Sequence, residues 1–209
     1  RIKQLGLIFV LLGFCLLPLV VSHRMVLMVI IMAFFYSYLA LSWNFIGGYG
    51  GQLSLAHASF FGIGAYITGV LFIELNISPW IGMLIGSCIA AFVAYIIGRV
   101  AFSYGLKGFF FLLVTLAITR IFSEVAKEIE IIGGPAGLWM PAKIGWQFLQ
   151  FRGRTEYYYI ILAFLLILIA INVILANSKL GHSLVAIRED EDAAEASGVD
   201  TRKCKTIVF

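Results

Sequence analysis

The chain has 209 residues, of which 62% are hydrophobic and only 12% are charged, and its formal net charge is +4. A soluble domain has about 25% charged residues, so a soluble fold of this size could not cover so much apolar surface. The composition excludes a soluble enzyme, a secreted disulfide domain and a disordered chain, and it argues against a barrel of alternating strands. In a membrane protein the positive charge reflects basic flanks, not nucleic-acid binding.

The uncharged runs of the chain are long enough to cross a bilayer, which takes about 20 helical residues. They lie at 4–21, 25–73, 75–98, 108–119 and 157–178. We predict an all-α polytopic protein with one transmembrane domain over 1–209 and about six spans, at 5–21, 25–46, 53–73, 80–98, 106–122 and 157–175. The apolar residues at 206–209 resemble the start of another span, so we expect this chain to be a C-terminally truncated piece.

A glycine-rich break divides the longest run, because four of the five residues 47–51 are glycine. Gln52, Ser54 and His57 follow it at membrane depth, where polar groups are costly and usually face a bundle interior or a cavity. Many transporters build a substrate site from a broken helix beside such groups. We predict a translocation pathway along Gly50, Gly51, Gln52, Ser54, His57 and Arg120. For His57, helix packing and a pathway role both remain open.

Two further features of the spans can be explained by structure alone, without a role in transport. Arg120 either reaches the nearby interface with its long side chain or pairs with a substrate carboxylate. Gly62, Gly64, Ala65 and Gly69 form a small-residue surface that would let helices approach closely. A protease pairing of Ser54 with His57 has no visible oxyanion hole or orienting acid.

The fifth span is expected to continue past the membrane, since the start of the polar interval 123–156 is amphipathic.

The end of the chain changes character, because 11 of the 29 residues at 177–205 are charged. We predict a water-exposed helical segment at 177–200 that stops at Gly198. If this tail is cytoplasmic, nine basic residues lie inside and six outside, as the positive-inside rule expects.

No phosphate-binding loop of the Walker type is present, and Cys15, Cys88 and Cys204 form no metal-ligand spacing. We therefore expect no catalytic residue, no metal and no cofactor in this chain.

Three separated stretches of the chain carry motifs that can be compared with a known family. The first is GYGGQLSLAHA at 48–58 with FGIGAY at 61–66. The second combines LKG at 106–108, VTLA at 114–117 and GGPAGL at 133–138. The third is AIREDEDAAEASGV at 186–199. Together, over about 40–209, they resemble permease subunits of branched-chain amino-acid ABC importers, in the M-type (LivM-like) form and not the H-type. The third stretch resembles the cytoplasmic coupling motif of that family.

The resemblance implies a multi-pass subunit of the bacterial inner membrane that is not an enzyme. It implies four kinds of protein partner or ligand besides membrane lipid: an H-type permease subunit, two ATP-binding subunits that use the ATP, an extracytoplasmic solute-binding protein and an amino-acid solute. The coupling motif implies contact with the ATPase through Arg188, Glu189, Glu191, Asp192, Ala193, Ala194, Glu195 and Gly198.

The solute stays open at this point. The position of Arg120 is often acidic in relatives, and Ala136 stands where a polar residue is common. Relatives also carry urea and short amides, so an importer of those solutes is one alternative. An autonomous channel or secondary transporter is another, although no ion-coupling carboxylate lies within the apolar spans.

Overall fold

The computed structural model describes residues 13–14, 17–18 and 23–209. The described chain is helical and holds no β-strand, only an isolated bridge between Gly145 and Gln150. Five of its helices are long and apolar enough to cross a membrane: Arg24–Tyr49, His57–Glu74, Pro79–Ser103, Gly108–Glu128 and Thr155–Ala176. These confirm the all-α polytopic class and five of the predicted spans. The span predicted at 5–21 lies outside the described residues except at four positions, and it stays a prediction.

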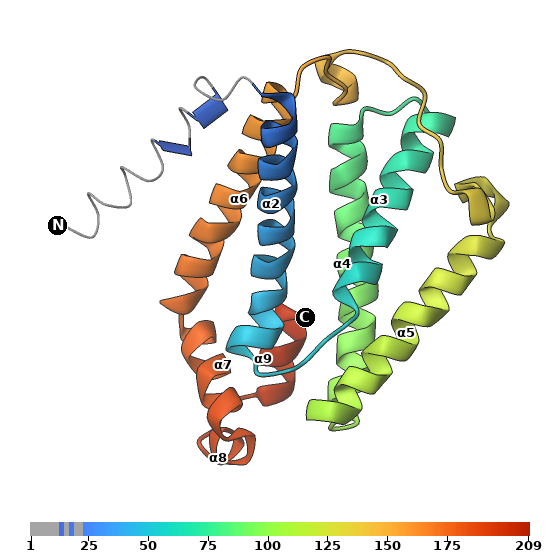
Figure 1. The fold of residues 1–209 in the computed structure, drawn as a ribbon. Helices are drawn as coiled ribbons and strands as arrows, with labels where there is room; N and C mark the ends of the chain where they lie inside the picture. The colour runs from blue at the N-terminus through green and yellow to red at the C-terminus, as the bar shows by residue number, and fades with distance from the viewer. Residues whose placement is uncertain (1–12, 15–16, 19–22) are drawn as a thin grey trace. The chain divides into compact units, whose positions relative to one another are not determined.

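The contacts of the chain divide it into two compact units, Arg1–Ser42 with Phe151–Asn172 and Trp43–Gln150 with Val173–Phe209. The first unit contains most of α2 (Arg24–Asn44) and α6 (Thr155–Ala176) (Figure 1). Its core is formed by Leu27, Phe34, Tyr158, Leu162 and Leu165. These residues recur at helical spacing on the two helices, so the apolar faces of α2 and α6 pack together.

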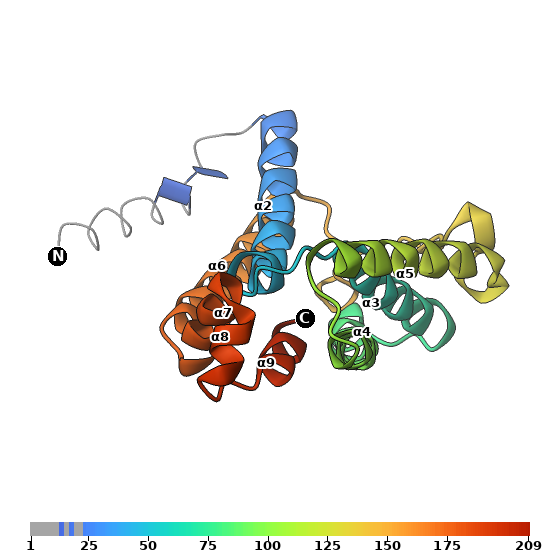
Figure 2. The same cartoon turned by 90° about the horizontal axis from the view of Figure 1, so that it is seen from below.

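The second unit contains α3 (His57–Glu74), α4 (Pro79–Ser103) and α5 (Gly108–Glu128), and also the three short helices at the end of the chain. Figures 1 and 2 show α3 and α4 side by side. The buried face of α4 is a row of small residues about one turn apart: Gly82, Gly86, Ala90, Ala94, Gly98 and Ala101. Small residues let membrane helices approach until their backbones touch, which is how α3 and α4 meet.

The predicted small-residue surface of α3 is used unevenly. A methyl group added at Gly86 of α4 would lie 2.6 Å from the carbonyl oxygen of Gly64, so these two glycines form the closest approach. Thr68 donates a 2.7 Å hydrogen bond to the same carbonyl and fills the space next to Gly82. Gly62, in contrast, has open space around it.

The last helices of the chain are α7 (Lys179–Glu189), α8 (Glu191–Ala196) and α9 (Thr201–Val208). The sequence predicted one continuous helical segment, but the helix breaks at Asp190, whose backbone is extended at φ −156° and ψ 106°. The Asp190 carboxylate accepts hydrogen bonds from the backbone N–H groups of Asp192 and Ala193, which caps α8. The predicted stop after α8 is confirmed, since Gly198 has φ +87°.

The end of α2 also differs from the prediction. The sequence placed a helix end at Ile46, whereas the helix continues as a π-helical turn, η1 (Phe45–Tyr49), and only then opens at Gly50 and Gly51. Gly47 and Gly48 lie directly against the side chains of Trp43 and Asn44, one turn earlier. The two glycines therefore make room for large side chains inside a helical turn instead of ending it.

We predict that Gly86→Ala destabilises the packing of α3 on α4 by about 1–3 kcal/mol, the usual cost of overpacking. Gly62→Ala is the matched control, because it adds the same methyl group to a helix where nothing lies within 4 Å. Thermal unfolding in detergent measures both variants. A melting temperature for Gly86→Ala that equals or exceeds that of Gly62→Ala would contradict the close approach.

Candidate functional site

The glycine break of the second unit runs from Gly50 to Ala56 between η1 and α3. Gly51 has φ +64°, a backbone conformation that side chains with a Cβ rarely adopt. The Trp43 indole N–H donates a 2.7 Å hydrogen bond to the carbonyl of Ser54, which folds the break back onto the end of α2. The backbone N–H of Gln52 donates to the carbonyl of Ile46 at 3.1 Å. The break is thus a defined turn of the chain.

Polar groups of the break are paired with α5. The buried Gln52 side chain accepts a 3.3 Å hydrogen bond from the N–H of Gly108, the first residue of α5. The N–H of Leu55 donates to the Thr115 hydroxyl at 3.1 Å. One turn further, the Thr119 hydroxyl donates to the carbonyl of Leu55 at 3.0 Å. These bonds satisfy polar groups that have no partner within a helix at the break.

The remaining pathway candidates are placed differently from one another. The buried Ser54 hydroxyl accepts from the N–H of Ala56 at 3.2 Å. The Nδ1 atom of His57 is buried and has no hydrogen-bond partner among the described residues. Arg120 is exposed on α5 and makes no ion pair in the described part of the chain. The structure therefore places Gln52 and Ser54 in the break and His57 at the start of α3, while Arg120 lies on the exposed surface of α5.

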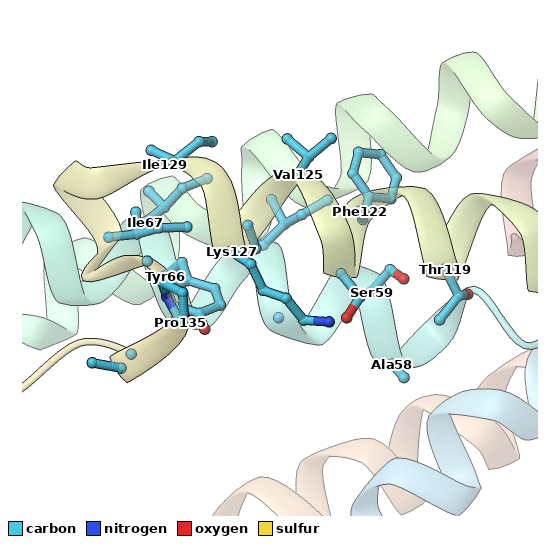
Figure 3. Close-up of a pocket in the computed structure, with 18 residues that line it drawn as sticks. Ala58, Ser59, Tyr66, Ile67, Thr119, Phe122, Val125, Lys127, Ile129 and Pro135 are labelled. Carbon is cyan, nitrogen blue, oxygen red and sulfur yellow. The ribbon is translucent and has the colours of Figure 1, made fainter.

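A cavity of about 640 Å³ lies between α3, α5 and the glycine-rich loop that follows α5 (Figure 3). Most of its lining is apolar, from Gly62 and Tyr66 of α3 to Phe122 of α5. The lining residues with polar side-chain groups are few: Ser59 and Tyr66 from α3, and Thr119, Ser123 and Lys127 from α5. The Lys127 ammonium also contacts Glu124 at 2.8 Å. A mostly apolar cavity with a few polar groups is typical of small-molecule sites.

The short helices at the end of the chain contact the glycine break through Arg188. Its guanidinium donates a 3.0 Å hydrogen bond to the carbonyl of Gly48 and pairs with the carboxylate of Glu189 at 2.8 Å. The stem of the side chain lies over Gly51, where an added methyl group would meet Cγ of Arg188 at 2.5 Å. Only glycine fits beneath this side chain.

An ion-pair network joins α8 and α9 to the link between α4 and α5. The ammonium of Lys205 on α9 lies 2.6 Å from the carboxylate of Glu191 on α8, and their side chains are 1% and 13% exposed. Lys107, next to α5, lies 3.6 Å from Glu191 and 3.0 Å from Asp192. The hydrogen bond to Asp192 raises the pKa of Lys107, and the negative charges of Glu191 and Asp192 add to the rise. Lys107 is therefore charged at physiological pH.

Aromatic rings surround the buried end of this network. Lys205 lies 5.0 Å from the ring centroid of Phe102, which is stacked on Phe111 at 4.9 Å. Phe209 packs edge-on against both rings, at 6.0 and 5.5 Å. Ring faces attract a cation, so the aromatic cluster holds Lys205 as well as packing α9.

The network gives α8 two faces. Glu191 and Ala194, three residues apart, turn inward and are held by the rest of the chain. The opposite face consists of exposed residues, and we call it the docking face: Asp192, Ala193, Glu195 and Ala196. Of the residues predicted to contact an ATPase, Arg188, Glu189, Glu191 and Asp192 also form ion pairs within this chain. Ala194 is buried, and Gly198 is the exposed stop after α8.

Sequence reasoning missed four residues of this site. Thr115 and Thr119 stand four residues apart on α5, a spacing that could have revealed a hydroxyl pair on one helix face. As basic residues beside apolar runs, Lys107 and Lys205 resemble the ordinary charged flanks of membrane spans. No local pattern reveals the burial of Lys205, because its partners Glu191 and Phe102 lie elsewhere in the sequence. Within the described residues, no cluster of His, Cys, Asp and Glu could hold a metal ion.

We predict that Gly51→Ala destabilises the fold more than Gly105→Ala does. Both glycines have positive φ, +64° and +68°, so both variants carry the backbone strain of about 1–2 kcal/mol. Only the methyl group at position 51 also meets Arg188, since Gly105 has open space around it. Thermal unfolding of the two variants in detergent isolates the contact. Equal losses of stability would show that Arg188 does not pack on the break.

Comparisons with known proteins agree with the resemblance seen in the sequence. Residues 25–209 match the family described as branched-chain amino acid transport system / permease component. One relative is the high-affinity branched-chain amino acid transport system permease protein LivM of Escherichia coli strain K12, at 29% identity over 83% of this chain and 46% of the relative. LivM of Salmonella typhimurium strain LT2 is 28% identical over 85% of this chain and 47% of its own length.

The chain spans about half the length of the curated relatives that it matches. No solved structure matches it at a significant level. The relatives and the five apolar helices make this a multi-pass protein of the inner membrane. With the family match covering 25–209, the chain belongs to the permease components of branched-chain amino acid transport systems.

Proposed function

We propose that this chain is the M-type permease subunit of an ATP-driven importer of leucine, isoleucine and valine. The observation that carries the proposal is the family match over 25–209, which includes both the glycine break and the α7–α9 segment. The relatives named LivM support the choice of solute, since their names specify branched-chain amino acids. Import of urea or short amides is the alternative within the same family.

The cavity between α3 and α5 suits such a solute. Its apolar lining would accept an aliphatic side chain, and the Lys127 ammonium would attract the carboxylate of an amino acid. The Ser59 hydroxyl could bond either end of a zwitterion, and the Thr119 hydroxyl, which donates its hydrogen to a backbone carbonyl, could accept from the ammonium end. We place the solute route at this cavity, next to the break that holds Gln52, Ser54 and His57. Urea and short amides have no carboxylate for Lys127 to attract.

We propose that ATP is bound and hydrolysed only by partner subunits. In this arrangement α7–α9 are cytoplasmic, and an H-type subunit completes the membrane pore. Two ATP-binding subunits lie below the pore, and one of them contacts α8. An extracytoplasmic binding protein delivers the solute on the opposite side. The docking face supports the α8 contact, because it leaves charged and small side chains uncovered on a helix whose other face is fixed.

The first test concerns the solute. The complete importer in proteoliposomes should take up labelled leucine, with competition by isoleucine and valine but not by urea or short amides. Lys127→Met should lower the uptake rate roughly 10- to 100-fold, since a hydrogen bond to a charged group contributes about 1.5–3 kcal/mol. Lys127→Arg keeps the charge and is the control. Uptake of urea in preference to leucine would replace the proposed solute by the alternative.

The second test concerns the docking face. Ala193→Trp adds a bulky side chain to the exposed side of α8 and should weaken binding of the ATP-binding subunits. The inward contacts of Glu191 and Ala194 do not involve this position. Arg202→Trp makes a matched control on the exposed side of α9. Co-purification of the tagged subunits measures the effect, and equal recovery with the two variants would remove α8 from the interface.

A further inference from the structure

Lys205 is the unusual charged residue of the second unit. Lysine is almost never fully buried unless it is paired, and the Lys205 side chain is 1% exposed. Its ammonium has two kinds of partner, the Glu191 carboxylate at 2.6 Å and the face of Phe102 at 5.0 Å. A lysine on a short helix at the protein surface could reach water easily. Here it points inward and joins three elements, α9, α8 and the end of α4.

The pair continues to α5 through Lys107. This residue directly precedes α5 and contacts Glu191 at 3.6 Å and Asp192 at 3.0 Å. Glu191 thus lies between two ammonium groups, one buried and one 47% exposed. We call these three residues, Lys107, Glu191 and Lys205, the linkage. It joins the inward face of α8 to the points where α4 ends and α5 begins.

Stability alone does not explain such a pair. A buried ion pair is expensive to desolvate, and apolar residues of similar volume often stabilise a fold equally well. What a short, charged contact adds is a defined geometry, because the attraction falls when the two groups separate in a nonpolar surrounding. The aromatic cluster of Phe102, Phe111 and Phe209 provides that surrounding. The pair therefore suits a contact that must keep its geometry when one of its helices is displaced.

We propose that Glu191 and Lys205 are positioning residues that make α8 move as one body with the adjoining ends of α4 and α5. This inference rests on the proposed function, since it assumes that an ATP-driven partner displaces α8. A displacement at the docking face then reaches α4 through Lys205 and α5 through Lys107. The Thr115 and Thr119 bonds of α5 carry it on to the glycine break. Without the linkage, α8 can be displaced while α4 and α5 stay in place.

The test uses the complete importer in proteoliposomes, with labelled leucine uptake and ATP hydrolysis measured on the same sample. Glu191→Gln with Lys205→Met removes both charges, keeps the volumes close and leaves no unpaired buried ion. We expect this double variant to assemble with its partners. Its ratio of hydrolysis to uptake should rise roughly 2- to 30-fold, as for residues that carry coupling between sites. Lys203→Met on the exposed side of α9 is the matched control and should keep the wild-type ratio.

A double-mutant cycle adds a second readout. Glu191→Gln and Lys205→Met break the same joint, so each assembled single variant should show as large a rise as the double variant. Rises that add up would mean independent roles and overturn the proposal. An unchanged ratio in the assembled double variant would also overturn it, and so would failure of that variant alone to assemble, which would assign the pair to folding. If the wild-type importer itself takes up no leucine, the proposed function fails instead.

Discussion

A buried lysine can exist at the end of this chain only because a carboxylate and an aromatic ring face it. Lys205 would be costly without Glu191, and Glu191 would be costly without its two ammonium partners. This mutual dependence fixes where α8 and α9 lie against α4 and α5. It also leaves the other side of α8 uncovered, so the same interaction that orients the inward face defines the docking face.

The rest of the second unit follows from close backbone contact. The close approach of Gly64 and Gly86 lets α3 pack against α4, and the Thr68 hydroxyl donates a hydrogen bond to the Gly64 carbonyl. The break before α3 is fixed separately, by Thr115 and Thr119 of α5 and by Arg188 of α7. The polar break thus contacts both a membrane span and the short helices at the chain end. Under the proposed function, these contacts form the route by which a displacement of the short helices would reach the break.

Hydropathy predicted most of the architecture, because the energy of crossing a bilayer depends on runs of apolar residues and little else. Spans α3, α4, α5 and α6 therefore overlap the predicted ranges 53–73, 80–98, 106–122 and 157–175. The bounds differ, however, because α3 begins only at His57, and α4 and α5 continue to Ser103 and Glu128. The helix that contains α2 was predicted to end too early. The low helix propensity of glycine favours a break at Gly47, but it takes no account of Trp43 and Asn44, which pack against Gly47 and Gly48 inside the helical turn. The break at Asp190 was missed because a capping carboxylate inside a charged run resembles any other acidic residue.

The site was only partly predictable for a related reason. Polar residues beside the glycines pointed to the break, and Gln52 and Ser54 are indeed buried there. A charged run is usually solvated, so the sequence could not separate Glu191 and Lys205, which turn inward, from Glu195 and Lys203, which stay exposed. That distinction depends on Phe102 and Lys107, which approach only after the chain has folded.

The most direct test of the account is a distance measurement between spin labels at Ser197, directly after α8, and Tyr104, at the end of α4. Both residues are exposed in this structure, and neither belongs to the docking face. The complete importer is compared without nucleotide and in a trapped ATP-hydrolysis state. The account predicts that the 197–104 distance distribution stays the same, while the distance from Tyr104 to a label in the ATP-binding subunit changes. A nucleotide-dependent change between positions 197 and 104 would show that α8 moves independently of the spans and would contradict it.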